Sequence, residues 1–348
     1  MLRSLRLFAI GSGLALSIAA APHEADACGG CLHGPSDTVT AVTSHRMVVA
    51  IHANDSILWD QVRYSGNPSD FAWVLPVWGN VQVELASADF FDTLDATTTV
   101  SVQAPFVNLS CPGTGGGGIG CGASAGLAPR DFSNSSDASA GADGGHVTVL
   151  HEMVVGPYET VTLRGTDANS LTNWLAMNSY VIPTAIAPVI QYYVDHGMDF
   201  VAMRLRPGQG VQAMQPVRIR YSTSNMVLPL RMVAAGVTDK VGITLWVFGN
   251  GRYEPANFGS GRVLNNDVVW DWTTESSNYR EAFDQTIMRL GGRAWITEFA
   301  NSATSVRQPD STDGRADFAL ATGASNMTFP SDSMTITRLT QPAGLVCP

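Results

Sequence analysis

The segment "ADACGGCLHGP" at residues 25 to 35 gathers Cys28, Cys31 and His33, residue types that bind transition metals. Zinc and copper sites take three or four such ligands, so the three side chains form a complete site only if the amine of a new N-terminus joins them. Cys28, Cys31 and His33 are therefore the metal-ligand candidates of this sequence.

The same pair of cysteines has other interpretations. A redox pair requires a thiol at a helix N-terminus, and Gly29-Gly30 favours neither a helix nor a strand there. A haem attachment sequence requires histidine directly after the second cysteine, where Leu32 stands. Structural disulfide cysteines beside a solvated histidine are the simplest interpretation.

The chain has five cysteines, and all are disulfide candidates: Cys28, Cys31, Cys111, Cys121 and Cys347. The spacing does not determine their connectivity. A bridge between Cys111 and Cys121 would close a flexible glycine-rich loop at modest entropic cost. A direct bridge from Cys28 to Cys31 would be strained, so we expect at least one of them to pair with a distant cysteine such as Cys347.

The N-terminus has the pattern of an export signal. Arg3 and Arg6 precede an apolar run over 7–21, and Ala25-Asp26-Ala27 is a small-residue cleavage site. The run is shorter than the roughly 20 residues that span a bilayer, and no later segment is long enough. We expect cleavage after residue 27 and export to the periplasm, the outer cell envelope or the medium. A lipid anchor at Cys28 is the alternative, although Ala25 stands where lipoprotein signals have a leucine-like residue.

Composition limits the class of protein. The chain has 348 residues, 45% of them hydrophobic, and a formal net charge of −10. This length and apolar content suffice for a substantial core. An acidic chain lacks the basic surface that nucleic acid requires, so we expect no nucleic-acid partner. No complete cofactor motif is present, and no cofactor is expected.

Several segments match catalytic motifs in sequence but lack the context or a residue that the motif requires. Ser124 lies in a G-x-S-x-G pattern, but a nucleophile elbow stands between a strand and a helix, whereas this pattern lies in a Gly/Ser/Ala tract. The G-x-G-x-x-G match from Gly113 precedes no predicted helix. His151-Glu152 begins a zinc-protease motif whose second histidine is replaced by Val155. These patterns predict no catalytic residue.

Hydrophobic periodicity predicts an α+β fold, with mostly antiparallel sheets and about four helices packed on them. The predicted strands form a hairpin over 46–64 with its turn at Asn54-Asp55, and then follow at 71–78, 147–154, 158–164, 199–206, 216–222, 226–234, 242–248 and 294–299. The predicted helices are 87–95, one capped by Thr166 or Asp167 and ended by Pro183, 184–196 and 277–290. The glycine- and serine-rich segment 112–145 is predicted as a disordered insert. We therefore divide the chain into a signal peptide (1–27), one folded unit (28–301) and a Ser/Thr/Asp-rich tail (302–348).

A series of segments resembles one bacterial family. They are Ala27-Cys28-Gly29-Gly30 after the signal, "FAWVLPV" (71–77), "VGPYE" (155–159), "WLAMNSYVIP" (174–183), "GMDFVAMRL" (197–205), "QPVRIRY" (215–221) and "PLRMVAAG" (229–236). Their order is similar to that in the family called domain of unknown function 2330. The resemblance covers roughly residues 27 to 300. It implies an exported envelope protein and no particular activity.

Two classes of function follow. The first is a non-catalytic binding or structural protein, whose partner would be an anionic surface polymer or another envelope protein. Its candidate ligand residues are arginines on predicted strands, which would form an anion site if those strands were neighbours and would otherwise pair with acidic groups: Arg204, Arg206, Arg218, Arg220 and Arg231. The second is a secreted hydrolase, which would require residues such as Asp60, His151, Asp195 and His196 to converge.

Overall fold

The computed structural model describes residues 31–32, 41–65, 72–105, 147–178, 180, 186–210, 213–224, 227–234, 243–249 and 251–323. Several predictions lie outside these residues. They concern the signal peptide, the insert at 112–145, the end of the tail, Ser124, and the side chains of Cys28, His33, Cys111, Cys121 and Cys347.

The first sheet has five strands in the order β1-β4-β8-β7-β6, and every neighbouring pair is antiparallel. The strands are β1 (Cys31–Leu32), β4 (Ala72–Val77), β6 (Val147–Val155), β7 (Tyr158–Gly165) and β8 (Asp199–Leu205). All but β1 were expected from apolar or alternating sequence patterns.

The second sheet has the order β10-β2-β3-β9-β5, and only β10 and β2 are parallel. The strands are β2 (Ala41–Ile51), β3 (Ser56–Ser65), β5 (Val81–Leu85), β9 (Val217–Tyr221) and β10 (Ile243–Phe248). The predicted hairpin is confirmed as β2 and β3, and its turn is closed by a hydrogen bond from His52 N to Asp55 O at 2.9 Å. Strand β5 was not predicted.

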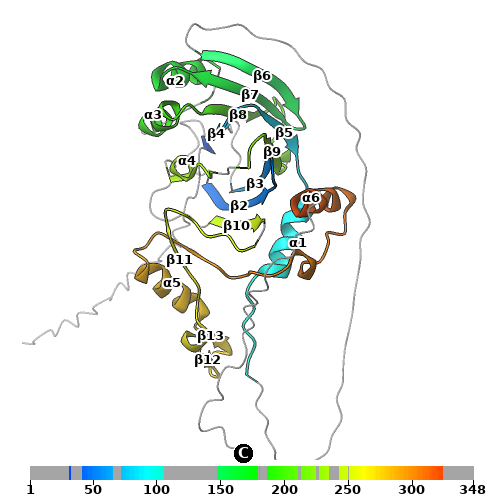
Figure 1. Cartoon of the computed structure of the whole chain (residues 1–348), viewed down its shortest axis with the longest axis vertical. Helices are drawn as coiled ribbons and strands as arrows, with labels where there is room; N and C mark the ends of the chain where they lie inside the picture. The colour runs from blue at the N-terminus through cyan, green and yellow to red at the C-terminus, as the bar shows by residue number, and fades with distance from the viewer. Residues whose placement is uncertain are drawn as a thin grey trace, which may run out of the picture.

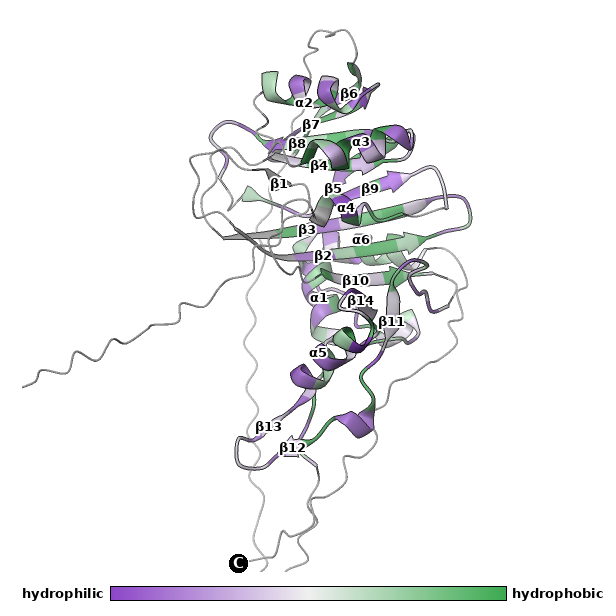
Figure 2. Cartoon of the chain, turned by 90° about the vertical axis from the view of Figure 1, so that its left-hand side faces the viewer, coloured by the Kyte–Doolittle hydropathy of each residue, from purple (hydrophilic) through white to green (hydrophobic). Residues whose placement is uncertain are grey.

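The two sheets pack face to face, with a continuous apolar core between them that includes Met47, Leu58, Val201 and Ile219 (Figures 1 and 2). Helices α2 (Ala168–Met177) and α3 (Ala187–Asp195) cover the outer face of the first sheet. Helices α1 (Ala88–Thr98) and α6 (Thr312–Thr322) cover the outer face of the second. The result is a four-layer α/β/β/α sandwich, and the predicted α+β class with mostly antiparallel sheets is confirmed.

Helix α2 begins where the sequence predicts. The Asp167 side chain accepts a hydrogen bond from Ser170 N at 2.8 Å, which satisfies one of the free amides of the first turn. Leu171 and Leu175 are fully buried one turn apart. Trp174 is only half-buried and stacks on Tyr180, with ring centroids 6.5 Å apart.

The strand predicted over 226–234 is wrong in its described part, because residues 230 to 234 form the short helix α4 (Leu230–Ala234). Pro229 has no amide hydrogen for a strand ladder and is well suited to the start of a helix. Leu, Arg, Met and Ala, which follow it, are good helix formers. This helix places Met232 in the interior, where its side chain is 2% exposed.

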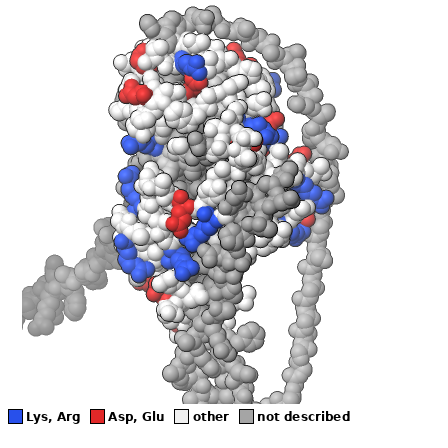
Figure 3. Space-filling view, viewed as in Figure 1, with Lys and Arg blue, Asp and Glu red and all other residues white. Residues whose placement is uncertain are grey.

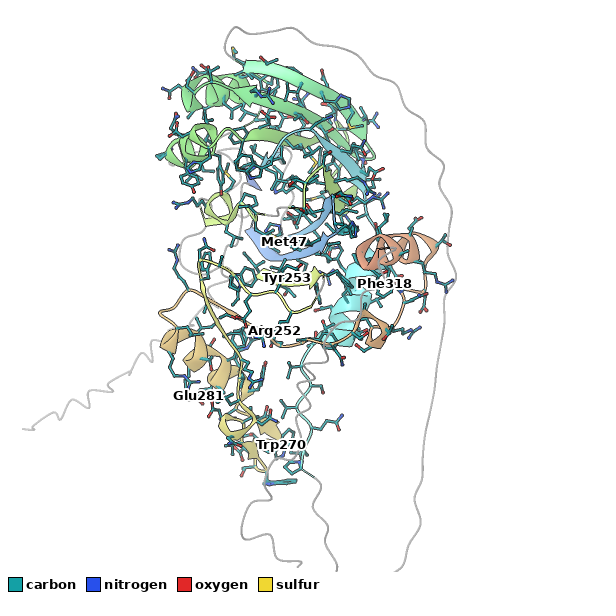
Figure 4. The ribbon with its side chains drawn as sticks, in the orientation of Figure 1. Met47, Arg252, Tyr253, Trp270, Glu281 and Phe318 are labelled. Carbon is teal, nitrogen blue, oxygen red and sulfur yellow. The ribbon has the colours of Figure 1, made fainter. Side chains whose placement is uncertain are left out.

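The segment predicted as a tail contains helix α6, which begins at the Ser311 cap and packs against α1. Phe318 and Ala321 are buried against the second sheet, and Figure 4 labels Phe318 at this contact. The folded unit therefore extends beyond residue 301. Within the described ranges, no helix is both long enough and apolar enough to cross a bilayer.

A small lobe lies beside the sandwich, at the bottom of Figure 1. It contains β11 (Gly259–Gly261), β12 (Trp270–Asp271), β13 (Ser276–Ser277), α5 (Tyr279–Arg289), β14 (Ala294–Ile296) and a 3-10 turn at Asn265–Asp267, and a second such turn follows at Ala303–Ser305. Val263, Val268 and Ala282 form its own minor core. The predicted helix at 277–290 is confirmed as α5.

Candidate functional site

A histidine–aspartate pair is buried between the two sheets. His45 Nε2 is hydrogen-bonded to Asp60 Oδ1. His45 is 2% exposed and Asp60 is 3% exposed. Polar groups are rarely buried so deeply without a complete set of hydrogen bonds.

The β2–β3 hairpin positions this pair. Its register places Asp60 directly opposite Met47, and His45 is two residues from Met47 on the same strand. Because side chains alternate along a strand, His45, Met47 and Asp60 share the face that points to the first sheet. Met47 is labelled in Figure 4, near the centre of the sandwich.

Each member of the pair has one polar atom left over. His45 Nδ1 and Asp60 Oδ2 are both buried and have no hydrogen-bond partner among the described residues. Leaving a buried polar atom unpaired costs about 1–3 kcal/mol, and more when the group is charged. Each of these two atoms is therefore free to make one further hydrogen bond or to bind an ion.

A small cavity lies at the pair. Its walls come from β2, β3, β4 and the α4 segment: His45, Met47, Leu58, Asp60, Trp73, Val74, Leu75, Pro229 and Met232. It leaves about 10 Å³ for the centre of a water-sized particle. That is room for about one water molecule or one monatomic ion.

Tyr221 lies near the pair. Burial raises the pKa of Tyr221, and the nearby Asp60 carboxylate raises it further. Tyr221 therefore stays neutral at ordinary pH and supplies no positive charge to Asp60.

Cys31 is the one predicted metal ligand whose strand position is described. It lies in β1 opposite Trp73, and Trp73 lines the cavity. Among the described residues, no three His, Cys, Asp or Glu side chains are grouped so that they could hold a metal ion.

The structure does not bring the five predicted arginines together. β8, with Arg204, belongs to the first sheet, and β9, with Arg218 and Arg220, belongs to the second. Arg204 lies on the α2 side of the sandwich and donates to Glu159 Oε2 at 2.7 Å and Asn178 O at 2.9 Å.

The other arginines also have partners or stand apart. Arg218 donates to Glu84 at 2.8 Å, and Arg220 pairs with Asp55 at 3.2 Å. The Arg231 guanidinium lies over the Tyr192 ring at 4.1 Å, and Arg206 is exposed beyond the end of β8. Figure 3 shows basic and acidic groups mixed on the visible face. Acidic pairing is thus the observed state of the three strand arginines, and anion binding by any of the five stays a prediction.

The residues considered for a hydrolase do not converge either. Asp60 is buried between the sheets, whereas His151 is exposed on β6. Asp195 and His196 are exposed at the C-terminal end of α3, where His196 Nδ1 lies 2.6 Å from Tyr192 O. The partner that sequence reasoning missed for Asp60 is His45. The hairpin turn at Asn54-Asp55 could have predicted this contact, because it sets the register that brings His45 near Asp60.

The fold and the site define a four-layer α+β sandwich protein with a small, mostly apolar cavity beside the buried histidine–aspartate pair. Residues 22–321 match the model of a bacterial family described as "Uncharacterized protein conserved in bacteria", domain of unknown function 2330, and the chain belongs to this family. The resemblance seen in the sequence is confirmed, and the match includes nearly all of α6. No curated protein and no solved structure matches the chain.

Proposed function

We propose that this chain is an exported bacterial envelope or extracellular protein that binds a small cation at His45 and Asp60 and is not an enzyme. Export is supported by the basic, apolar and small-residue pattern of residues 1–27. Cation binding is supported by one observation, the cavity of about 10 Å³ next to two unpartnered polar atoms.

Size favours an ion over an organic ligand. Pockets for small molecules have volumes of roughly 300–1,000 Å³. The cavity at His45 is far below that range. Its size is that of one water molecule or one monatomic ion.

Charge favours a cation as well. A buried carboxylate without a counter-charge costs several kcal/mol, and one free oxygen of Asp60 faces no donor. With His45 neutral, its Nε2–H donates to Asp60 and the lone pair of Nδ1 is available to a cation. A cation bound at Nδ1 would then satisfy that atom, and the Asp60 carboxylate on the other nitrogen of the same ring would balance its charge.

Elemental analysis of the protein purified from the periplasm tests this function. We expect one metal ion per chain in the wild type and loss of that ion in Asp60→Asn and His45→Gln. The matched control is Asp199→Asn, because Asp199 is also buried but is paired with Arg164 at 2.7 Å away from the cavity. A metal-free wild-type protein, or metal retained equally in all variants, would contradict ion binding at this pair.

Intact mass tests the export part separately. Cleavage after residue 27 predicts a chain that begins at Cys28 without a lipid. Uncleaved protein in the cytoplasm would contradict export. An acylated Cys28 would show that the exported protein is anchored to a membrane.

The histidine–aspartate pair also favours a second candidate function, a secreted hydrolase. A histidine held by a carboxylate is the usual general base for a serine or cysteine nucleophile. Labelling with a fluorophosphonate or with iodoacetamide distinguishes the two functions. Labelling of one residue that disappears in His45→Gln would favour the hydrolase, and equal labelling of wild type and variant would favour the binding protein.

A further inference from the structure

We infer that the cation is cuprous ion, Cu(I), and that the thioethers of Met47 and Met232 bind it together with Nδ1 of His45. This inference rests on the proposed cation site and identifies the ion that binds there. The side chains that line the cavity include two methionines beside the histidine.

The two methionines approach the cavity from different elements. Met47 is adjacent to His45 on the inner face of β2 and opposite Asp60. Met232 comes from α4 and lines the cavity with its neighbour Pro229. Both methionines are 2% exposed, so their sulfur atoms are shielded from bulk water.

The donor set selects the metal. Zinc and the hard cations prefer nitrogen, thiolate and oxygen ligands. In the described part of the chain no group of three such His, Cys, Asp or Glu side chains exists, so these metals would find only His45 and Asp60 here. Thioethers are soft ligands that favour Cu(I), and adding Met47 and Met232 to His45 completes a three-ligand site for that ion.

The remaining walls fit the same ion. Asp60 holds the other imidazole nitrogen of His45, the arrangement that commonly fixes the orientation of a metal-binding histidine. One carboxylate charge balances the single charge of Cu(I). Trp73 also lines the cavity, and an indole ring attracts a nearby cation.

A water molecule is the competing occupant. It would hydrogen-bond to His45 Nδ1, and the methionines would then be ordinary packing residues. Cu(I) would require the methionine sulfur atoms as ligands, whereas a water molecule would not. Replacing methionine by leucine keeps the volume and the apolar character but removes the thioether.

The test is an anaerobic titration with Cu(I) against a colorimetric chelator. It compares the wild type with Met47→Leu, Met232→Leu and the double variant. The controls are Met198→Leu and Met203→Leu, which alter equally buried methionines that do not line the cavity. All five cysteines are present in every protein, so copper bound by thiols cancels in the comparison.

We expect the wild type and both controls to bind one more equivalent of Cu(I) than the double variant, and each single variant to bind that equivalent at least about tenfold more weakly. Equal copper binding by all the proteins would overturn the inference. A parallel titration with Zn²⁺ separates the two proposals: an equivalent of zinc that depends on Asp60 but not on the methionines would refute Cu(I) and keep the cation site. If neither metal binds at the pair, both proposals fail. Should the double variant not fold, the two single variants decide the outcome.

Discussion

Trp59 and Asp317 are 258 positions apart in the chain, and Trp59 Nε1 donates a hydrogen bond to Asp317 Oδ1 at 2.9 Å. The same carboxylate accepts from Arg218 at 2.8 Å and from the backbone N of Ser87 at 2.7 Å. Asp317 is 1% exposed, so these bonds are shielded from water. One side chain of α6 thereby connects β3, β9 and the start of α1.

Asp317→Ala should destabilise the protein by about 3 kcal/mol, because it leaves the buried Trp59 Nε1 and Ser87 amide without an acceptor. Chemical denaturation measures the change. The control is Asp313→Ala in the exposed first turn of α6, which should cost less than about 1 kcal/mol. Equal losses in the two variants would show that the α6 contact contributes little to stability.

Alkaline pH should weaken the fold through Tyr158. Burial raises its pKa from 10.0 to about 12. Between these values the unfolded chain loses a proton that the folded chain keeps, so the free energy of unfolding falls as pH rises, by about 3 kcal/mol in all. Below pH 10 this contribution is fully present.

Tyr158→Phe isolates that contribution. The variant loses the hydrogen bonds of the hydroxyl with Gln215, at 2.7 Å to its carbonyl and 2.8 Å from its amide, so it should be about 1 kcal/mol less stable than the wild type at neutral pH. The difference should shrink or reverse as pH rises from 10 to 12, because phenylalanine cannot ionise. Denaturation curves at several pH values measure this, and a constant difference would contradict the assignment.

Helix α2 offers a test of core packing. Leu175 is fully buried, and Leu175→Ala should cost about 3 kcal/mol. Trp174 is half-buried against Tyr180, so Trp174→Ala should cost about 2 kcal/mol or less despite its larger side chain. Thermal unfolding of the two variants ranks them, and a larger loss for Trp174 would show that α2 is rotated about its axis relative to the described packing.

Local patterns in the sequence predict most elements of the sandwich. The alternating residues around Asn54-Asp55 predict the β2–β3 hairpin, and Asp167 predicts the start of α2, since both depend on contacts within a few residues. Helix α4 was missed because the apolar residues of 226–234 suit a strand, while Pro229 and the helix formers after it favour a helix. Helix α6 was missed because its segment is rich in Asp, Thr and Gly, and its burial depends on α1, more than 200 residues away.

The cavity at His45 depends more on long-range packing than the helices and strands do. The hairpin register alone brings His45 toward Asp60, so that contact was accessible from the sequence. Met232 reaches the same cavity only through the packing of α4 against the sheets, which no periodicity encodes. The sequence left open whether the arginine-bearing strands are neighbours, and β8 and β9 lie in different sheets, because sheet membership is set by pairings that are distant in sequence.

Anomalous diffraction would locate a cation in the cavity at His45 and Asp60. Crystals of the copper-loaded, reduced protein would be measured above and below the copper absorption edge. We expect an anomalous peak between the sheets, within bonding distance of His45 Nδ1 and of the sulfur atoms of Met47 and Met232. A water molecule hydrogen-bonded to His45 Nδ1, with no anomalous signal at that position, would rule the cation out.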